Sequence, residues 1–140
     1  MLAWKVLQIP VMRVLIADDQ PGVGGTLALL VAAARHHVVK VVSSGAEAIQ
    51  AYHTYHPDVV LMDFSMGKLN GLTAARYIMT EDPCARIIFV SNRYLPQLTG
   101  TGAVGILRKP VDLTELAELL NTLDQQLVFD YARHSTTTGS

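Results

Sequence analysis

Short apolar runs alternate with longer mixed segments from residue 12 to residue 123. The runs are rich in Val, Ile and Leu and have no regular polar positions, which favours strands buried on both faces. We expect five strands, at residues 14–17, 38–42, 59–62, 86–90 and 104–107. The longer segments contain Ala, Leu and spaced polar residues, which favours helices at 26–34, 46–55, 72–79 and 112–123. This alternation predicts an α/β fold with an open, doubly wound, five-stranded parallel sheet.

The segment between the fourth and fifth strands is shorter than the others. Only about a dozen residues follow Ser91 before the fifth strand, and they include Pro96, Gly100 and Gly102. We therefore expect a shortened fourth helix of one or two turns. Outside the alternation lie an N-terminal extension, residues 1–11, and a C-terminal tail or linker, residues 124–140, on either side of a domain at 12–123. Residues 4–9 alternate like a strand, which leaves an edge strand, a packing arm and an added extension open.

Composition narrows the class of protein. A length of 140 residues suits one domain, and a hydrophobic fraction of 50% disfavours disorder. The formal net charge of −1 disfavours a nucleic-acid binder or a polybasic membrane-surface protein. With a single cysteine, neither an intramolecular disulfide nor a Cys-rich zinc site can form. No apolar run approaches the ~18 residues of a membrane span, and no signal-peptide pattern is present. We expect a soluble, cytoplasmic protein.

Polar and ionisable side chains follow four of the five expected strands. Asp18 and Asp19 follow the first strand, Asp63 the third, Ser91 the fourth and Lys109 the fifth. In open α/β sheets, ligands bind beyond the carboxyl ends of the strands, so these groups should converge. Three carboxylates there would repel each other, and Mg²⁺ would relieve the conflict. With a lysine and a hydroxyl added, the set suits a phosphoryl group, and a carboxylate can act as the nucleophile.

These segments resemble the receiver domain of bacterial two-component response regulators. The matching motifs are residues 14–19, 57–66, 70–71, 89–91 and 107–110, and the resemblance covers roughly residues 12–123. Each motif alone is weak, whereas their order and spacing together are specific. The resemblance implies a flavodoxin-like, chemotaxis-regulator-like fold with strand order 2-1-3-4-5.

The resemblance also implies a role for each site residue. Asp63 would be the phosphoacceptor, and Mg²⁺ would be held by Asp18, Asp19, Asp63 and the backbone carbonyl of Ser65. Ser91 and Lys109 would contact the phosphoryl group. The switch would involve Ser91 and the residue at the position of Ile106.

A module of this kind would act in signalling and catalyse only its own phosphorylation and dephosphorylation. Its implied partner is a sensor histidine kinase or a phosphotransfer protein, and a homodimer is a further option. We expect no membrane binding and no direct nucleic-acid binding by this segment. The output domain or target is not readable from the sequence.

Three substitutions depart from the family pattern. Ile106 stands where the family usually has an aromatic residue coupled to the hydroxyl of the fourth strand, and Asn92 stands where a small residue is usual. Gly67 replaces the usual loop proline, which would loosen that loop. These departures motivate an alternative function, a degenerate receiver that acts as a constitutive protein-interaction module. A small Mg²⁺-dependent phosphatase is disfavoured, because such enzymes usually need an Asp-x-Asp arrangement, and here Asp18 and Asp19 are adjacent.

Other polar groups are assigned structural roles. The glycines at 22–25 lack the pattern of a phosphate-binding loop and predict a frayed start to the first helix. Asp58 is interpreted as a turn residue, and Ser43 or Ser44 and Asp112 as helix caps. Surface positions are expected for His36, His37, His53 and His56.

Overall fold

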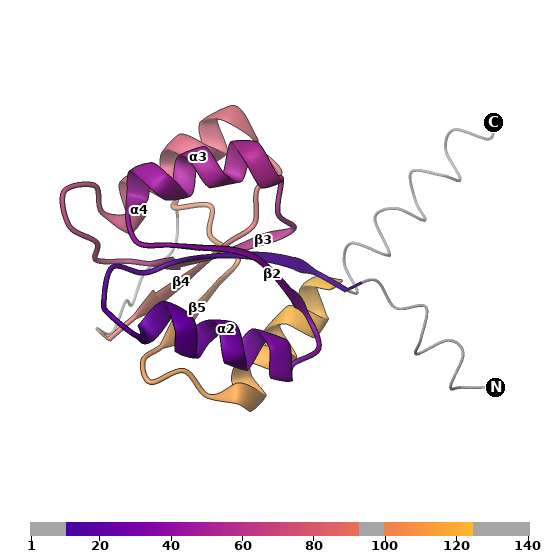
Figure 1. Cartoon of the computed structure of the whole chain (residues 1–140). Helices are drawn as coiled ribbons and strands as arrows, with labels where there is room; N and C mark the ends of the chain where they lie inside the picture. The colour runs from indigo at the N-terminus through magenta and orange to yellow at the C-terminus, as the bar shows by residue number, and fades with distance from the viewer. Residues whose placement is uncertain (1–10, 93–99, 125–140) are drawn as a thin grey trace, which may run out of the picture.

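The computed structural model describes residues 11–92 and 100–124. One parallel sheet forms the centre, in the order β2-β1-β3-β4-β5 (Figure 1). This confirms the predicted fold class and strand order. The strands are β1 (Arg13–Ala17), β2 (His37–Val42), β3 (Val59–Asp63), β4 (Ile87–Ser91) and β5 (Gly105–Arg108).

Helices cover both faces of the sheet (Figure 1). On one face lie α3 (Gly45–Tyr55) and α4 (Gly71–Glu81). On the other lie α2 (Val23–Ala33) and a final helix that includes residues 113–124. None of the described helices has both the length and the apolar character that crossing a membrane requires.

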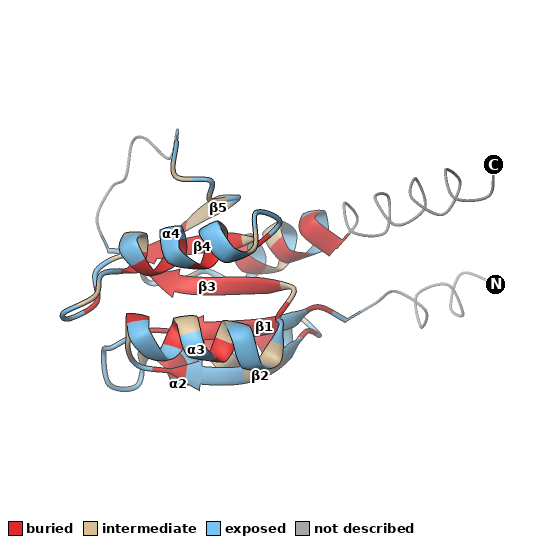
Figure 2. Cartoon of the chain, turned by 90° about the horizontal axis from the view of Figure 1, so that it is seen from above, coloured by how far each residue is buried: buried red, intermediate tan, exposed pale blue. Residues whose placement is uncertain are grey.

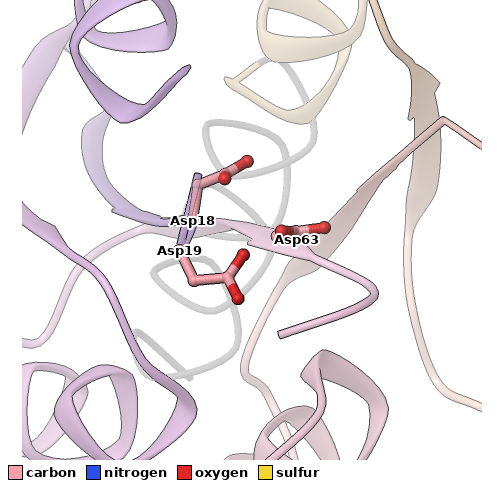
Figure 3. Close-up of side chains that lie close together, drawn as sticks. All are labelled: Asp18, Asp19 and Asp63. Atoms are coloured by element: carbon pink, nitrogen blue, oxygen red, sulfur yellow. The ribbon is translucent and has the colours of Figure 1, made fainter. Parts of the chain in front are cut away.

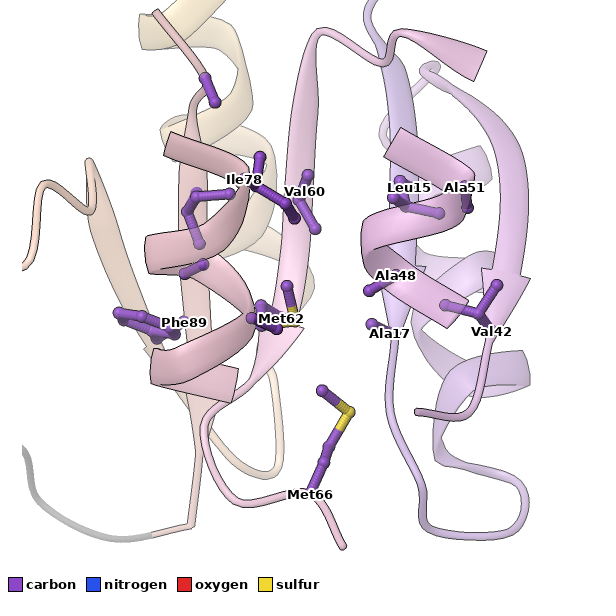
Figure 4. Packing of buried hydrophobic residues seen from close by; sticks show 14 residues of the cluster. Leu15, Ala17, Val42, Ala48, Ala51, Val60, Met62, Met66, Ile78 and Phe89 are labelled. Carbon is purple, nitrogen blue, oxygen red and sulfur yellow. The ribbon is translucent and has the colours of Figure 1, made fainter. Parts of the chain in front are cut away.

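The core follows from the continuous apolar strands. β3 and β4 are buried along their whole length, whereas the edge strands β2 and β5 are partly exposed (Figure 2). Alternate strand residues pack into two clusters, one beneath each helical layer. The cluster beneath α3 and α4 includes Leu15, Val60 and Phe89 (Figure 4). Double coverage holds the sheet rigidly and leaves the carboxyl ends of its strands along one edge.

Side-chain caps fix the start of three helices. Ser44 Oγ accepts from the backbone N–H of Glu47 at 3.1 Å, and Asp112 Oδ2 accepts from that of Glu115 at 3.0 Å. Both caps were predicted. Asn70 Oδ1 accepts from the N–H of Thr73 at 2.8 Å and caps α4 directly after the loop that follows β3.

Helix α2 begins at Val23, three residues before the predicted start at 26, and has Gly22 as its N-cap with a φ of 82°. The glycines therefore form the start of this helix, as predicted. A Cβ at Gly24 would lie 2.8 Å from Val41 Cγ1, so glycine lets α2 approach β2 closely. Gly24 therefore serves packing, whereas a Cβ at Gly25 would meet nothing within 4 Å.

Smaller differences concern element ends. α4 extends beyond the predicted 72–79, and β4 and β5 each lie one residue further along the chain than predicted. The shortened fourth helix falls mainly on residues 93–99, outside the described residues, as do the alternating segment at 4–9 and nearly all of both proposed terminal extensions.

His36 is buried, contrary to the prediction of a surface histidine. Its side chain lies at the amino-terminal edge of the sheet, where Nδ1 accepts from the backbone N–H of Met12 at 3.1 Å. Its Nε2 lies 3.2 Å from Asn121 Oδ1 on the final helix. The final helix covers this edge, which no local pattern reveals. His37, His53 and His56 are exposed, as predicted.

Candidate functional site

Three carboxylates meet at the carboxyl edge of the sheet (Figure 3). Asp18 and Asp19 directly follow β1, and Asp63 is the last residue of the neighbouring β3. One oxygen from each side chain lies within 4.8 Å of the others. Asp18 and Asp63 are buried, whereas Asp19 is exposed. The structure thus brings together the three acids that the sequence predicted to converge.

Lys109 supplies positive charge to this acidic trio from the segment after β5. Its Nζ lies 2.9 Å from Asp18 Oδ2 and 3.6 Å from Asp63 Oδ1. The same ammonium donates to Gln20 Oε1 at 2.9 Å, and the backbone N–H of Gln20 donates to Asp18 Oδ1 at 2.9 Å. Gln20 therefore connects Lys109 to Asp18, a role that sequence reasoning missed. One ammonium cannot balance three ionised carboxylates, so the site keeps an excess of negative charge.

The pKa of Asp63 reflects this imbalance. Burial is the largest cause, and the charge of Asp18 is the next, in raising the pKa of Asp63 from 3.8 to about 6. The N–H of Ser65, which donates to Asp63 Oδ1 at 3.2 Å, and the charge of Lys109 oppose the rise. Asp63 is therefore mostly ionised at neutral pH but is held in an unfavourable environment.

Ser91 lies at the same edge, as predicted. It is the last residue of β4 and is buried, and its carbonyl accepts from the backbone N–H of Lys109 at 2.8 Å. Ile106 lies opposite Phe89 in the β4–β5 ladder and is partly buried. Asn92 is exposed beside Ser91.

The loop from Phe64 to Asn70 touches two of the three acids. Ser65 donates to Asp63, and the backbone N–H of Gly67 donates to Asp19 Oδ2 at 3.1 Å. The loop then returns to β3, because Gly71 N–H donates to Phe64 O at 3.0 Å and a Cβ at Gly71 would lie 1.9 Å from Asp63 O. The requirement for glycine at 71 and the contact made by Gly67 both depend on the path of this loop, and sequence reasoning missed them.

The acidic trio fits a hard divalent cation. Its donors are all carboxylate oxygens, which Mg²⁺ prefers. Asp18 Oδ2 is buried and, apart from its charge pairing with Lys109, accepts no hydrogen bond from the described residues. An incompletely satisfied buried oxygen beside two further carboxylates is the environment that a cation would stabilise.

Known proteins share both the fold of this chain and its sequence family. Solved receiver domains share this fold, among them that of AraT from Geobacillus stearothermophilus, with a TM-score of 0.77, 24% identity, and coverage of 87% of this chain and 99% of that one. The chain belongs to the response regulator receiver domain family, whose model matches residues 14–121. Receiver domains are signalling modules of two-component systems.

Two relatives match over most of their length. Chemotaxis protein CheY of Thermotoga maritima is 32% identical over 117 residues, which cover 81% of this chain and 98% of the relative. The CheX-CheY-BeF₃-Mg²⁺ complex from Borrelia burgdorferi contains a chain with 26% identity and a TM-score of 0.77, covering 85% of this chain and 92% of that one.

Other relatives are considerably longer than the matched region. Transcriptional regulatory protein DegU of Brevibacillus brevis is 31% identical over 80% of this chain, but the match covers only 49% of DegU. For a protein-glutamate methylesterase/protein-glutamine glutaminase of Pseudomonas putida, the match covers 25% of the relative. The similarity therefore concerns the receiver portion of these proteins.

Proposed function

We propose that this protein is a phosphoacceptor receiver that takes a phosphoryl group from a sensor histidine kinase or a phosphotransfer protein onto Asp63. The observation that carries the proposal is the position of Asp63, which is buried at a strand end beside Asp18 and 3.6 Å from Lys109 Nζ. Membership of the receiver family and the similarity to CheY support the same function. We place this activity in the cytoplasm, where a kinase could reach the site.

In the transfer, an Asp63 carboxylate oxygen attacks phosphorus and forms a P–O bond. The P–N bond to the donor imidazole breaks, and the imidazole leaves with that electron pair. Lys109 Nζ, which lies 3.6 Å from Asp63 Oδ1, neutralises one phosphoryl oxygen. The hydroxyl of Ser91 donates a hydrogen bond to another.

The ligands that would hold Mg²⁺ are the carboxylates of Asp18, Asp19 and Asp63 with the backbone carbonyl of Ser65. When bound, the ion supplies charge neutralisation for the incoming phosphoryl oxygens. One structural neighbour is the CheX-CheY-BeF₃-Mg²⁺ complex from Borrelia burgdorferi, which supports this ligand chemistry for a similar chain.

Phosphorylation would change the surface around the site. A protein phosphoryl group adds roughly −1.5 to −2 charges at neutral pH, which the hydroxyl of Ser91 and the ammonium of Lys109 can meet. Movement of Ser91 would pass to the neighbouring β5, where Ile106 lies, and would shift the population of partner-binding states.

Intact-protein mass spectrometry with a small-molecule phosphodonor and Mg²⁺ tests the proposal. The wild type should gain the mass of one phosphoryl group, whereas Asp63→Asn and wild type with EDTA should gain none. Asp58→Asn is a matched control, because Asp58 lies at the opposite edge of the sheet, where its Oδ2 accepts from the N–H of Arg13 at 2.7 Å. Folded wild type that gains no phosphoryl group with donor and Mg²⁺ present would contradict the proposal.

A constitutive interaction module is the second candidate function. Ile106 favours it, because an aliphatic side chain cannot make the aromatic rotamer change that usually couples to the hydroxyl of the fourth strand. NMR spectra with and without beryllofluoride and Mg²⁺ separate the two functions. Shifts that extend from Ser91 to Ile106 favour the switch, and shifts confined to the residues around Asp63 favour the constitutive module.

A further inference from the structure

The backbone N–H of Gly67 contacts the exposed carboxylate of the acidic trio. It donates to Asp19 Oδ2 at 3.1 Å from a position 48 residues further along the chain. Among the described residues, it is the one hydrogen-bond donor to Asp19. A proline at this position would have no N–H and could not make this bond.

The loop that carries this N–H is held in place by the two residues that precede Gly67. Met66 is 2% exposed and packs in the cluster beneath α3 and α4 (Figure 4). Ser65, one residue earlier, donates to Asp63 Oδ1. The loop therefore joins a carboxylate from β3 to one that follows β1, and its amide groups approach both from a fixed backbone.

An exposed carboxylate without such a donor would sample several rotamers. Asp19 is the exposed member of the trio, whereas Asp18 and Asp63 are oriented by burial, by Lys109 and by neighbouring N–H groups. A hydrogen bond to Oδ2 keeps the side chain of Asp19 toward the other two and leaves its second oxygen for a cation. This arrangement preorganises the ligand set before the metal arrives.

We propose that the Gly67 amide is a positioning group for Asp19, which raises the affinity of the acidic trio for Mg²⁺. The proposal rests on the metal site of the proposed function and assigns Gly67 an effect exerted through Asp19. It also reverses the expectation that glycine merely loosens this loop.

Two substitutions at one position separate the amide from the side chain. Gly67→Ala keeps the N–H, and its Cβ would meet nothing nearer than Asp19 Oδ2 at 4.0 Å. Gly67→Pro removes the N–H. In Mg²⁺ titrations of the full chain by calorimetry, Gly67→Pro should weaken binding roughly tenfold, within the range for lost outer-shell partners of a metal ligand. Gly67→Ala should retain most of the affinity. Equal affinities for the two variants would overturn the proposal.

A double-mutant cycle excludes a general effect of proline on the loop. In an Asp19→Ala background, Gly67→Pro should cause little further loss of Mg²⁺ affinity, because the group on which the amide acts is gone. A tenfold loss in both backgrounds would show that proline acts elsewhere, for example through the carbonyl of Ser65, and would refute the role of the amide.

A comparison of wild type with Asp19→Ala gives a test that does not depend on how the proline variant folds. Asp19→Ala should move the Gly67 amide proton upfield and speed its exchange with solvent, whereas the amide of Gly105, which lies opposite Ile88 at the start of β5, should not respond. An unchanged Gly67 amide would refute the hydrogen bond. Wild type that fails to bind Mg²⁺ would instead remove the metal site of the proposed function, and this inference with it.

Discussion

Asp63 is destabilising in its ionised form, because burial and Asp18 raise the pKa of its carboxyl to about 6. Between the unfolded value of 3.8 and about 6, the unfolded chain releases a proton that the native chain retains. Stability therefore falls as pH rises through this window, and the cost is fully present above it. The same ionised carboxylate is the group that a cation would bind and a phosphodonor would react with.

Asp63→Asn should stabilise the metal-free protein at neutral pH. The expected rise in the free energy of unfolding is about 1–3 kcal/mol near pH 7.5, because a neutral side chain replaces the disfavoured carboxylate. Urea denaturation with EDTA at several pH values measures this rise, which should shrink below about pH 6 and vanish near pH 4. Glu81→Gln, at the exposed end of α4, controls for the change in net charge. A variant no more stable than wild type at pH 7.5 would refute the prediction.

His36 shows where residue-scale prediction from the sequence failed. Its two ring contacts involve Met12 and Asn121, which lie 24 and 85 positions away along the chain. No periodicity around residue 36 carries that information. The side chain is buried because the final helix covers the amino-terminal edge of the sheet, a consequence of tertiary packing alone.

His36→Leu should lower the free energy of unfolding by about 1–3 kcal/mol. The substitution leaves the buried N–H of Met12 without its acceptor, and an unpaired buried donor costs about that much. His37→Leu is the matched control, because His37 is exposed and a surface change is usually worth less than about 0.5 kcal/mol. Urea denaturation measures the free energy of unfolding of both variants. Equal losses of stability would show that the hydrogen bond from Met12 N–H to His36 Nδ1 is unimportant.

At the scale of elements, the sequence predicted most of the site because its residues stand at strand ends. Asp18, Asp63 and Lys109 could be brought together once the strands were known to be parallel, since parallel strands share a carboxyl edge. The contact from Gly67 to Asp19 could not be predicted, because it depends on the path of the loop after β3. The start of α2 was placed three residues too late for a related reason, since the close approach of Gly24 to Val41 is a tertiary contact that local propensity does not report.

Two glycines at helix starts should respond in opposite ways to alanine. A Cβ at Gly71 would lie 1.9 Å from the carbonyl oxygen of Asp63, so Gly71→Ala must displace backbone at the site and should destabilise by about 3 kcal/mol or more. A Cβ at Gly25 meets nothing within 4 Å, so Gly25→Ala should stabilise α2 by about 0.5–1 kcal/mol. Chemical denaturation measures both. A loss under about 1 kcal/mol for Gly71→Ala would contradict the close approach of α4 to β3.

The acidic trio and the last described residues lie at opposite edges of the sheet. The acidic trio occupies the carboxyl edge, while the last described residues lie at the opposite edge, where Arg86 Nη1 donates to Leu123 O at 3.0 Å just before β4 begins. A phosphoryl group on Asp63 would therefore act on Leu123 only through the sheet or along its helical faces. Because the strands are buried and closely packed, repositioning at one strand end can be transmitted as a rigid shift.

Mg²⁺ should stabilise the whole fold through the acidic trio. A ligand that binds only the native state adds about 1.4 kcal/mol to the free energy of unfolding at ten times its dissociation constant. Thermal unfolding near pH 7.5 with increasing MgCl₂ should show this rise for the wild type and for Asp58→Asn, whose acid lies at the far edge. Asp19→Asn should lose most of it, because one carboxylate of the ligand set is gone. NaCl at matched ionic strength separates specific binding from screening, since screening would stabilise all three proteins alike. Equal stabilisation of Asp19→Asn and wild type by MgCl₂ would place the effect of the cation outside the trio.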